Sequence, residues 1–304
     1  MRLFDLHCDT LYECDRQNLE LWENPLDLDV KRGLAFEAYI QVFAAFIPDN
    51  LRGEAAQIHG RRLLRLAAQQ AERYPQLCSV RCAHDLDTAQ AQHRCGMLLA
   101  VEGGAVLGGE LSMVDELACL GVKLLTITWN GENELGCGCM SGREEGLTSF
   151  GKAALRRLNE QKILPDVSHL NEAGFWDVAA VTDGPFLATH SLSAAVHPHP
   201  RNLTDAQFCC IRDHGGLVGL NLCTAHLGEG SFAAFERHLA HFLELDGAHT
   251  VALGCDLDGA PLPKEWAGID TLSALERQLQ QDGFDAKTCE QLFFSNAYEF
   301  FHWL

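Results

Sequence analysis

The sequence predicts an α/β protein folded as a (β/α)8 barrel, in a single domain that spans residues 1–304. Three observations lead to this prediction. Eight short apolar runs recur along the chain, segments of helical period separate them, and chemically versatile polar residues follow several of the runs. Repeated strand–helix alternation is typical of this barrel, and a chain of this length often forms one such domain.

Each apolar run is a predicted strand. The runs are short and almost continuously hydrophobic, which suits strands that are buried on both faces of a parallel sheet. In chain order they are residues 3–6, 39–46, 97–101, 122–128, 163–167, 186–189, 217–220 and 251–253.

The segments between the runs predict amphipathic helices. Residues 54–73 carry apolar side chains on one side and Arg and Gln on the other. Helical period also appears over residues 149–161, 231–245 and 273–281, and Thr204 with Asp205 has the N-cap signal of a further helix. An open doubly wound sheet is the alternative fold. It would normally carry a Gly-rich phosphate-binding turn after its first strand, and this chain has none there.

Composition and charge exclude several classes of partner. Lys and Arg number 23 and Asp and Glu 42, which gives a net charge of −19. This charge disfavours nucleic acid and anionic membranes, both of which need clustered basic residues. The thirteen cysteines are scattered and accompany no secretory signal. We therefore expect a cytoplasmic protein whose cysteines are mostly reduced core residues.

Metal-binding residue types follow four of the predicted strands. His7 and Asp9 follow the first strand and Glu102 the third, while His169 and His190 follow the fifth and the sixth. Each of them alone has an ordinary structural explanation, such as a solvated turn, a helix cap or a hydrogen-bonded core histidine. Because the carboxyl ends of barrel strands meet at one mouth, we expect all five side chains to lie close together. Imidazole and carboxylate groups gathered in this way favour a metal site.

The strand-end residues belong to longer motifs, and together these resemble the renal (membrane) dipeptidase family of zinc peptidases, within the metal-dependent amidohydrolase barrels. No serine-hydrolase elbow, P-loop or H-E-x-x-H helix competes with this interpretation. The resemblance covers nearly the whole chain and is carried by residues 4–10 (FDLHCDT), 101–104 (VEGG), 125–128 (LTIT), 146–151 (GLTSFG), 166–169 (DVSH), 189–191 (THS), 200–205 (PRNLTD) and 256–259 (DLDG).

The resemblance implies a site with two zinc ions. It assigns His7, Asp9 and a bridging Glu102 to one ion, and the same Glu102 with His169 and His190 to the other.

The resemblance also assigns roles around the metals. It places Arg201 on the carboxylate of the substrate and Asp256 at the proton transfer, whereas Asp258 is expected to be structural. Animal members of the family have a histidine where this chain has Trp129. An indole cannot carry a positive charge, so we expect Trp129 to stack on the substrate, with Asn130 as a nearby hydrogen-bond donor.

The predicted function is hydrolysis of the peptide bond of dipeptides by a zinc-bridged hydroxide. Two alternatives stay open: a related amidohydrolase that acts on a lactam, lactone or N-acyl amino acid, and a catalytically silent binding protein. The sequence does not give the preferred dipeptide, its stereochemistry or the oligomeric state, and a homodimer is compatible with it.

Overall fold

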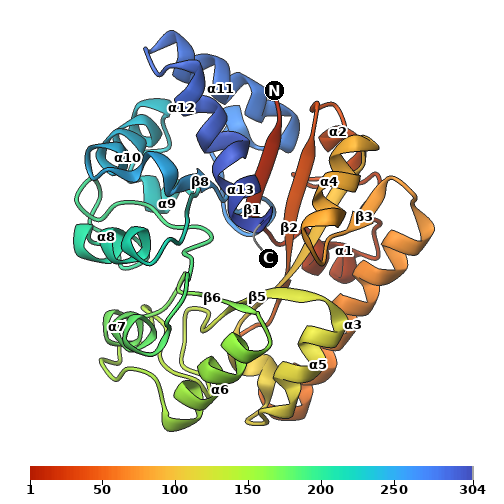
Figure 1. The fold of residues 1–304 in the computed structure, drawn as a ribbon, viewed down its shortest axis with the longest axis vertical. Helices are drawn as coiled ribbons and strands as arrows, with labels where there is room; N and C mark the ends of the chain where they lie inside the picture. Colours follow the sequence, from red (N-terminus) through yellow and green to blue (C-terminus); the bar gives the residue numbers. More distant parts are fainter. Residues whose placement is uncertain (303–304) are drawn as a thin grey trace.

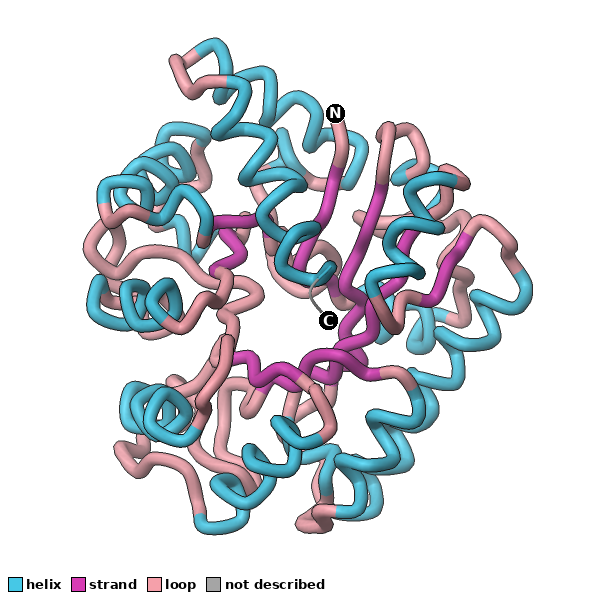
Figure 2. The backbone as a smooth tube through the Cα atoms, in the orientation of Figure 1, coloured by secondary structure: helices cyan, strands magenta, loops and turns pink. Residues whose placement is uncertain are grey.

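The computed structural model describes residues 1–302 and confirms the predicted parallel barrel. The strands are β1 (Leu3–Cys8), β2 (Tyr39–Phe46), β3 (Leu77–Ser79), β4 (Cys95–Glu102), β5 (Val122–Thr126), β6 (Leu164–Asp166), β7 (Val218–Leu220) and β8 (Val251–Leu253). They pair in the order β6-β5-β4-β2-β1-β8-β7, with every pair parallel. Figure 2 shows the strands in magenta around the centre of the molecule, with helices outside them.

The sixth predicted run, residues 186–189, completes the ring without forming a regular strand. It is joined to its neighbours by the single bridges Asp166–Leu187 and Ala188–Val218, which connect it to β6 and β7. The short strand β3 was not expected. It pairs with the first residues of β4, and β5 pairs with the remainder, so β3 lies outside the ring.

Helices surround the ring of strands, and the five predicted ones are present (Figure 1). The α-helices are α1 (Thr10–Gln17), α2 (Val30–Gly33), α3 (Gly53–Arg73), α4 (Ala83–Ala91), α5 (Ser112–Leu120), α6 (Ser149–Glu160), α7 (Glu172–Val181), α8 (Asp205–Asp213), α9 (Thr224–Leu227), α10 (Phe232–Glu244), α11 (Leu272–Gln281), α12 (Ala286–Glu290) and α13 (Asn296–His302). Short 3-10 segments cover η1 (Gly104–Leu107), η2 (Gly247–His249), η3 (Lys264–Trp266) and η4 (Ile269–Thr271), and the π-helical η5 (Gln291–Ser295) joins α12 to α13.

The interior of the barrel is apolar at one end and polar at the other. Its apolar layer contains Leu124, Leu164 and Leu187 from three neighbouring segments, and α13 covers it from below with Phe301. Two residues further along each segment, the same alternation brings Thr126, Asp166 and Thr189 inward. The polar layer therefore lies at the carboxyl ends of the strands, where the candidate ligands also lie.

One β-bulge adjusts the first strand. Asp5 pairs with Gln41 of β2 and Cys8 pairs with Phe43, so β1 has one extra residue over this stretch. A bulge re-aims the side chains that follow it. Here it turns His7 toward the barrel mouth, although strict alternation would place it on the same face as Asp5.

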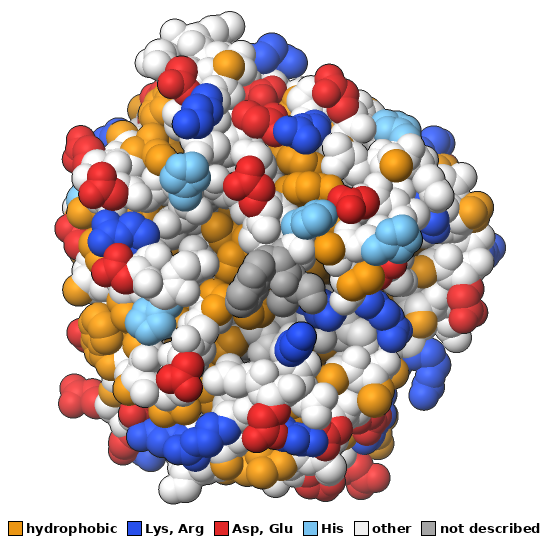
Figure 3. Space-filling view, viewed as in Figure 1, with side chains coloured by type: hydrophobic (Ala, Val, Ile, Leu, Met, Phe, Trp, Pro, Cys, Tyr) orange, Lys and Arg blue, Asp and Glu red, His pale blue; other side chains and the backbone are white. Residues whose placement is uncertain are grey.

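The face that α13 crosses is shown in space-filling form in Figure 3. Acidic and basic side chains are interspersed over it, with hydrophobic side chains between them. Among the described residues, no helix has both the length and the hydrophobicity needed to cross a membrane. All thirteen cysteines, which lie within that part of the chain, are unpaired, and eight are buried.

Candidate active site

The structure brings the five predicted metal ligands together at the carboxyl end of the barrel. Glu102 is the last residue of β4, and the others lie on β1 or in the loops that follow β1, β6 and the 186–189 segment. All five are buried, with exposed fractions between 1% and 8%. Charged groups that are buried this deeply require a partner, which is the first indication of a metal site.

Glu102 lies between two groups of ligands. Its Oε2 is 3.6 Å from Nε2 of His7, and its Oε1 is 2.9 Å from Nε2 of His169 and 3.5 Å from Nε2 of His190. The two carboxylate oxygens thus face different sets of donors. This is the arrangement that a carboxylate bridging two cations requires.

His169 and His190 present two lone pairs to each other. Nδ1 of His169 lies 2.9 Å from Oδ1 of Asn130, an amide oxygen that can only accept, so this Nδ1 carries the proton. The two Nε2 atoms are 2.8 Å apart. Burial, followed by the charge of Arg201 for His169 and of His7 for His190, holds the pKa of both rings well below the usual range. Two neutral acceptors this close need a cation near them.

A buried relay fixes the tautomer of His190. Thr189 donates its only hydroxyl proton to Oδ2 of Asp166 at 2.7 Å, so the 2.9 Å contact between Thr189 Oγ1 and His190 Nδ1 must be donated by the histidine. Asp166 is fully buried and also accepts from the Thr126 hydroxyl and the Ser168 and Thr189 backbone N–H groups. Nε2 of His190 is therefore left as a free ligand atom, as in other second-sphere carboxylate–histidine arrangements.

A second group of buried side chains consists of His7, Asp9 and Asp256, of which Asp256 is not one of the predicted ligands. Nε2 of His7 is 3.7 Å from an oxygen of Asp9 and 3.8 Å from Oδ1 of Asp256. Nε2 of His7 and Oδ1 of Asp9 are buried without any hydrogen-bond partner among residues 1–302. A Cβ on Gly259 would lie 2.2 Å from Oδ2 of Asp9 and 2.4 Å from Oδ1 of Asp256, so only glycine lets this turn approach so closely.

The charges in this group perturb one another. Burial and the negative charge of Asp9 raise the pKa of Glu102 to about 7. Burial also raises the pKa of Asp256 to about 6, against the opposing effect of His7. Burial has the largest single effect on the pKa of His7 and lowers it, but the charges and hydrogen bonds of Glu102 and Asp9 together outweigh burial and raise this pKa well above its usual range. Clustered carboxylates of this kind are costly without cations and are typical of functional sites.

The nitrogen and oxygen atoms of this cluster are also of the kinds that bind divalent metal ions. Neutral imidazole nitrogens and carboxylate oxygens are ligands that zinc prefers. Two potential ligand clusters are present among the described residues, His7–Glu102–His190 and His7–Asp9–Asp256. They share His7, whereas the sequence prediction made Glu102 the shared residue. His190 enters the first cluster because its ring centroid lies 3.8 Å from that of His7. Which residues hold each ion stays a prediction.

The predicted substrate-binding residues lie around this cluster. Arg201 is buried beside His190, and its Nη2 donates to the His190 carbonyl at 3.2 Å. Trp129 packs edge-on against Phe46, and its ring centroid is 6.2 Å from that of His169. Asn130 holds His169 through its Oδ1, a role that sequence reasoning missed; its contact with substrate stays a prediction.

Asp256 and Asp258 differ in their contacts. Asp258 accepts hydrogen bonds from the Thr10 hydroxyl at 2.6 Å and from the Asp27 backbone N–H at 2.7 Å, so it holds two loops together. Asp256 instead faces the ligand cluster.

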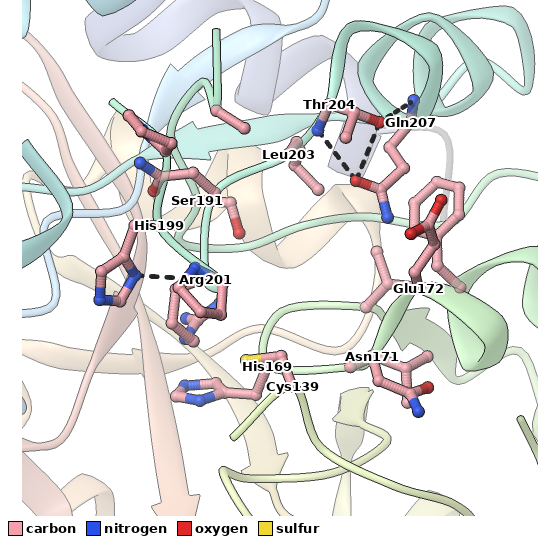
Figure 4. A pocket seen from close by; sticks show the side chains of 17 residues that line it. Cys139, His169, Asn171, Glu172, Ser191, His199, Arg201, Leu203, Thr204 and Gln207 are labelled. Atoms are coloured by element: carbon pink, nitrogen blue, oxygen red, sulfur yellow. Dashed lines mark hydrogen bonds between the residues drawn. The ribbon is translucent and has the colours of Figure 1, made fainter. Parts of the chain in front are cut away.

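A cavity of about 420 Å³ opens beside the cluster. His169 and Arg201 lie on one side of it, and Glu172 and Gln207 lie on the other (Figure 4). No sequence signal marked Glu172, Gln207 or the Thr189–Asp166 relay as site residues, because each has an ordinary local role in a strand or at a helix start.

Comparison with known proteins identifies the family. The model of the membrane dipeptidase family (peptidase family M19) matches residues 1–302. An uncharacterized protein of the pqqA 5′ region of Klebsiella pneumoniae is 33% identical over 227 residues, which are 70% of this chain and 84% of that protein. Dipeptidase 3 of Mus musculus is 25% identical over 278 residues, 86% of this chain but 54% of the mouse protein.

A solved structure is similar over its whole length. It is a metallopeptidase from Rhodobacter sphaeroides, liganded with a phosphinate mimic of the dipeptide L-Ala-D-Ala, with 28% identity, a TM-score of 0.91 and 98% of each chain covered. The chain described here therefore belongs to the membrane dipeptidase family (peptidase family M19) and is an enzyme of the metallo-dipeptidase type.

Proposed function

We propose that this protein is a zinc-dependent dipeptidase with two metal ions at the carboxyl end of its barrel. The observation that carries the proposal is the position of Glu102, whose two oxygens face His7 on one side and the His169–His190 pair on the other. The similar Rhodobacter sphaeroides metallopeptidase, liganded with a dipeptide mimic, supports a dipeptide as the substrate.

In the proposed reaction, two zinc ions would lower the pKa of a water molecule between them and polarise the peptide carbonyl. His7, Asp9 and Glu102 would hold one ion, and Glu102, His169 and His190 the other. Asn130 and Thr189 keep the two histidine Nε2 atoms unprotonated for this purpose.

Asp256 and Arg201 act on the substrate. Asp256 lies at the edge of the cluster, 3.8 Å from His7, where one carboxylate oxygen can take the proton of the attacking water and pass it to the leaving amine. Arg201 binds the C-terminal carboxylate with its guanidinium group, which restricts the substrate to short peptides. The cytoplasmic location of the protein stays a prediction.

The test is hydrolysis of an L-Xaa-L-Xaa and L-Xaa-D-Xaa dipeptide panel by zinc-loaded protein, beside a lactam, a lactone and an N-acyl amino acid. The proposal expects zinc-dependent cleavage of free dipeptides. Cleavage of only the lactam, lactone or N-acyl compound, or of no compound, would contradict it.

A further inference from the structure

The cavity beside the metal ligands is lined by His169 and Arg201, two residues of the proposed substrate and metal site. On the proposed function, the scissile peptide lies at the ligand cluster and the C-terminal carboxylate lies on Arg201. The Cα of the last residue is bonded to both the scissile nitrogen and the carboxylate carbon. Since His169 and Arg201 line one side of the cavity, this side chain would extend from there toward Glu172 and Gln207 (Figure 4).

Gln207 presents a free donor to this cavity. The side chain is 7% exposed, and its Oε1 accepts the Thr204 backbone N–H at 2.9 Å as part of the capping box that begins α8. Because Oε1 is fixed as an acceptor, Nε2 is the group that faces the cavity, and it has no hydrogen-bond partner among residues 1–302. An amide donor that faces a cavity without a partner among residues 1–302 favours a ligand that accepts a hydrogen bond.

Two further groups define what that ligand should be. Glu172, at the start of α7, is exposed at the same side of the cavity as Gln207 and supplies an acceptor. Ser191 is 1% exposed, lines the cavity, and has a hydroxyl with no partner among residues 1–302. A carboxylate ligand would be repelled by Glu172, and an apolar ligand would leave Gln207 and Ser191 unsatisfied.

We infer that this cavity selects dipeptides whose C-terminal residue carries a carboxamide side chain, with glutamine favoured by the size of the cavity. The side-chain carbonyl accepts from Gln207 Nε2, and the side-chain NH2 donates to Glu172. Gln207 is then a residue that determines specificity. The inference rests on the proposed function, because it takes its substrate orientation from Arg201 and the metal cluster.

The experiment compares kcat/KM for Ala-Gln, Ala-Glu and Ala-Met, which differ little in side-chain length. Each dipeptide is measured with an L residue and with a D residue at the C-terminus. The order of the kcat/KM values is compared within the L series and within the D series. We expect Ala-Gln to exceed Ala-Met at least about tenfold, with Ala-Glu between them. The Kd values of the same dipeptides for metal-free protein, measured by calorimetry, should follow the same order.

Gln207→Glu is the matched variant. Glutamate keeps the capping box of α8, since its carboxylate still accepts the Thr204 N–H, but it removes the donor and adds a negative charge. The preference for Ala-Gln over Ala-Met should then shrink below about threefold, and Ala-Glu should lose most. Glu172→Gln, which tests the opposite partner, should raise Ala-Glu relative to Ala-Gln. Melting temperatures check that both variants are folded.

The outcomes separate this inference from the proposed function. The inference alone would be overturned if Ala-Gln and Ala-Met were cleaved equally well in both the L and the D series. It would also be overturned if folded Gln207→Glu kept the same preference for Ala-Gln over Ala-Met. Cleavage of none of the dipeptides by zinc-loaded protein would overturn the proposed function and the inference with it.

Discussion

At the end of the barrel covered by α13, Phe301 stacks on Phe4 with ring centroids 5.3 Å apart, and both side chains are almost fully buried. At the opposite end, two imidazole nitrogens face each other at 2.8 Å, and Nε2 of His7 has no hydrogen-bond partner among residues 1–302. The same strand β1 carries Phe4 to one end and His7 to the other. The aromatic rings at the first end pack against each other within the chain, whereas the imidazole nitrogens at the second end need a cation near them. The difference separates the groups that stabilise the fold from those that perform the chemistry.

The largest expected effect is on catalysis at the open end of the barrel, which is the end that carries the candidate metal ligands. Asp256→Asn keeps the size of the side chain but removes its ability to take a proton. We expect kcat to fall by roughly 10²–10⁴-fold, with zinc content near that of the wild type. Steady-state kinetics and elemental analysis measure the two quantities. A variant that keeps more than about a tenth of wild-type kcat would refute this role, and loss of metal would make Asp256 a ligand.

A substitution at the packed end of the barrel, which α13 covers, should lower the stability of the fold and leave catalysis unchanged. Phe301→Ala removes a buried ring that contacts Phe4, and the expected loss is about 3 kcal/mol in the free energy of unfolding. Denaturant unfolding measures it. Because Phe301 lies at the far end of β1 from His7, kcat/KM of the folded variant should stay unchanged, and a large fall in kcat/KM would show that the two ends are coupled.

Arg201→Ala should separate substrate binding from metal binding at the open end. The contact between a guanidinium and a carboxylate is worth roughly 1.5–3 kcal/mol, so kcat/KM for free dipeptides should fall accordingly. Dipeptides amidated at the C-terminus lack the carboxylate and should lose little more. If both kinds of substrate fall equally, the contact of Arg201 with the His190 carbonyl is the important one and its role is structural.

The smallest expected effect concerns Thr189, which acts through His190. Thr189→Val keeps the shape but breaks the relay to Asp166, so the tautomer of His190 is no longer fixed. We expect zinc affinity to fall about 10–100-fold, as measured by competition with a chelator. Thr189→Ser retains the hydroxyl and is the control. Equal zinc affinity in the valine and serine variants would show that the hydrogen bonds of Thr189 do not affect zinc binding.

The sequence allowed the fold to be predicted because its signals are local. Each of the eight apolar runs lies in the ring, and Thr204 begins α8 as the N-cap signal predicted. Residues 186–189 depart from this only in forming isolated bridges, since the chain there pairs too briefly for a regular strand.

The site was less accessible to sequence reasoning. His7 and Glu102 could be placed at strand ends, but the bulge that turns His7 inward depends on the pairing of β1 with β2. The donor and acceptor roles of Asn130, Thr189 and Gln207 depend on neighbours distant in sequence or on a tautomer. No local pattern contains that information.

We propose that the open end of the barrel, at the carboxyl ends of its strands, is a two-metal site. The most direct measurement is the zinc content of the purified protein after loading and removal of loosely bound metal. The account predicts about two zinc ions per chain and activity that is lost on chelation and restored by zinc. A zinc content near zero, with no gain in activity on adding zinc, would contradict it.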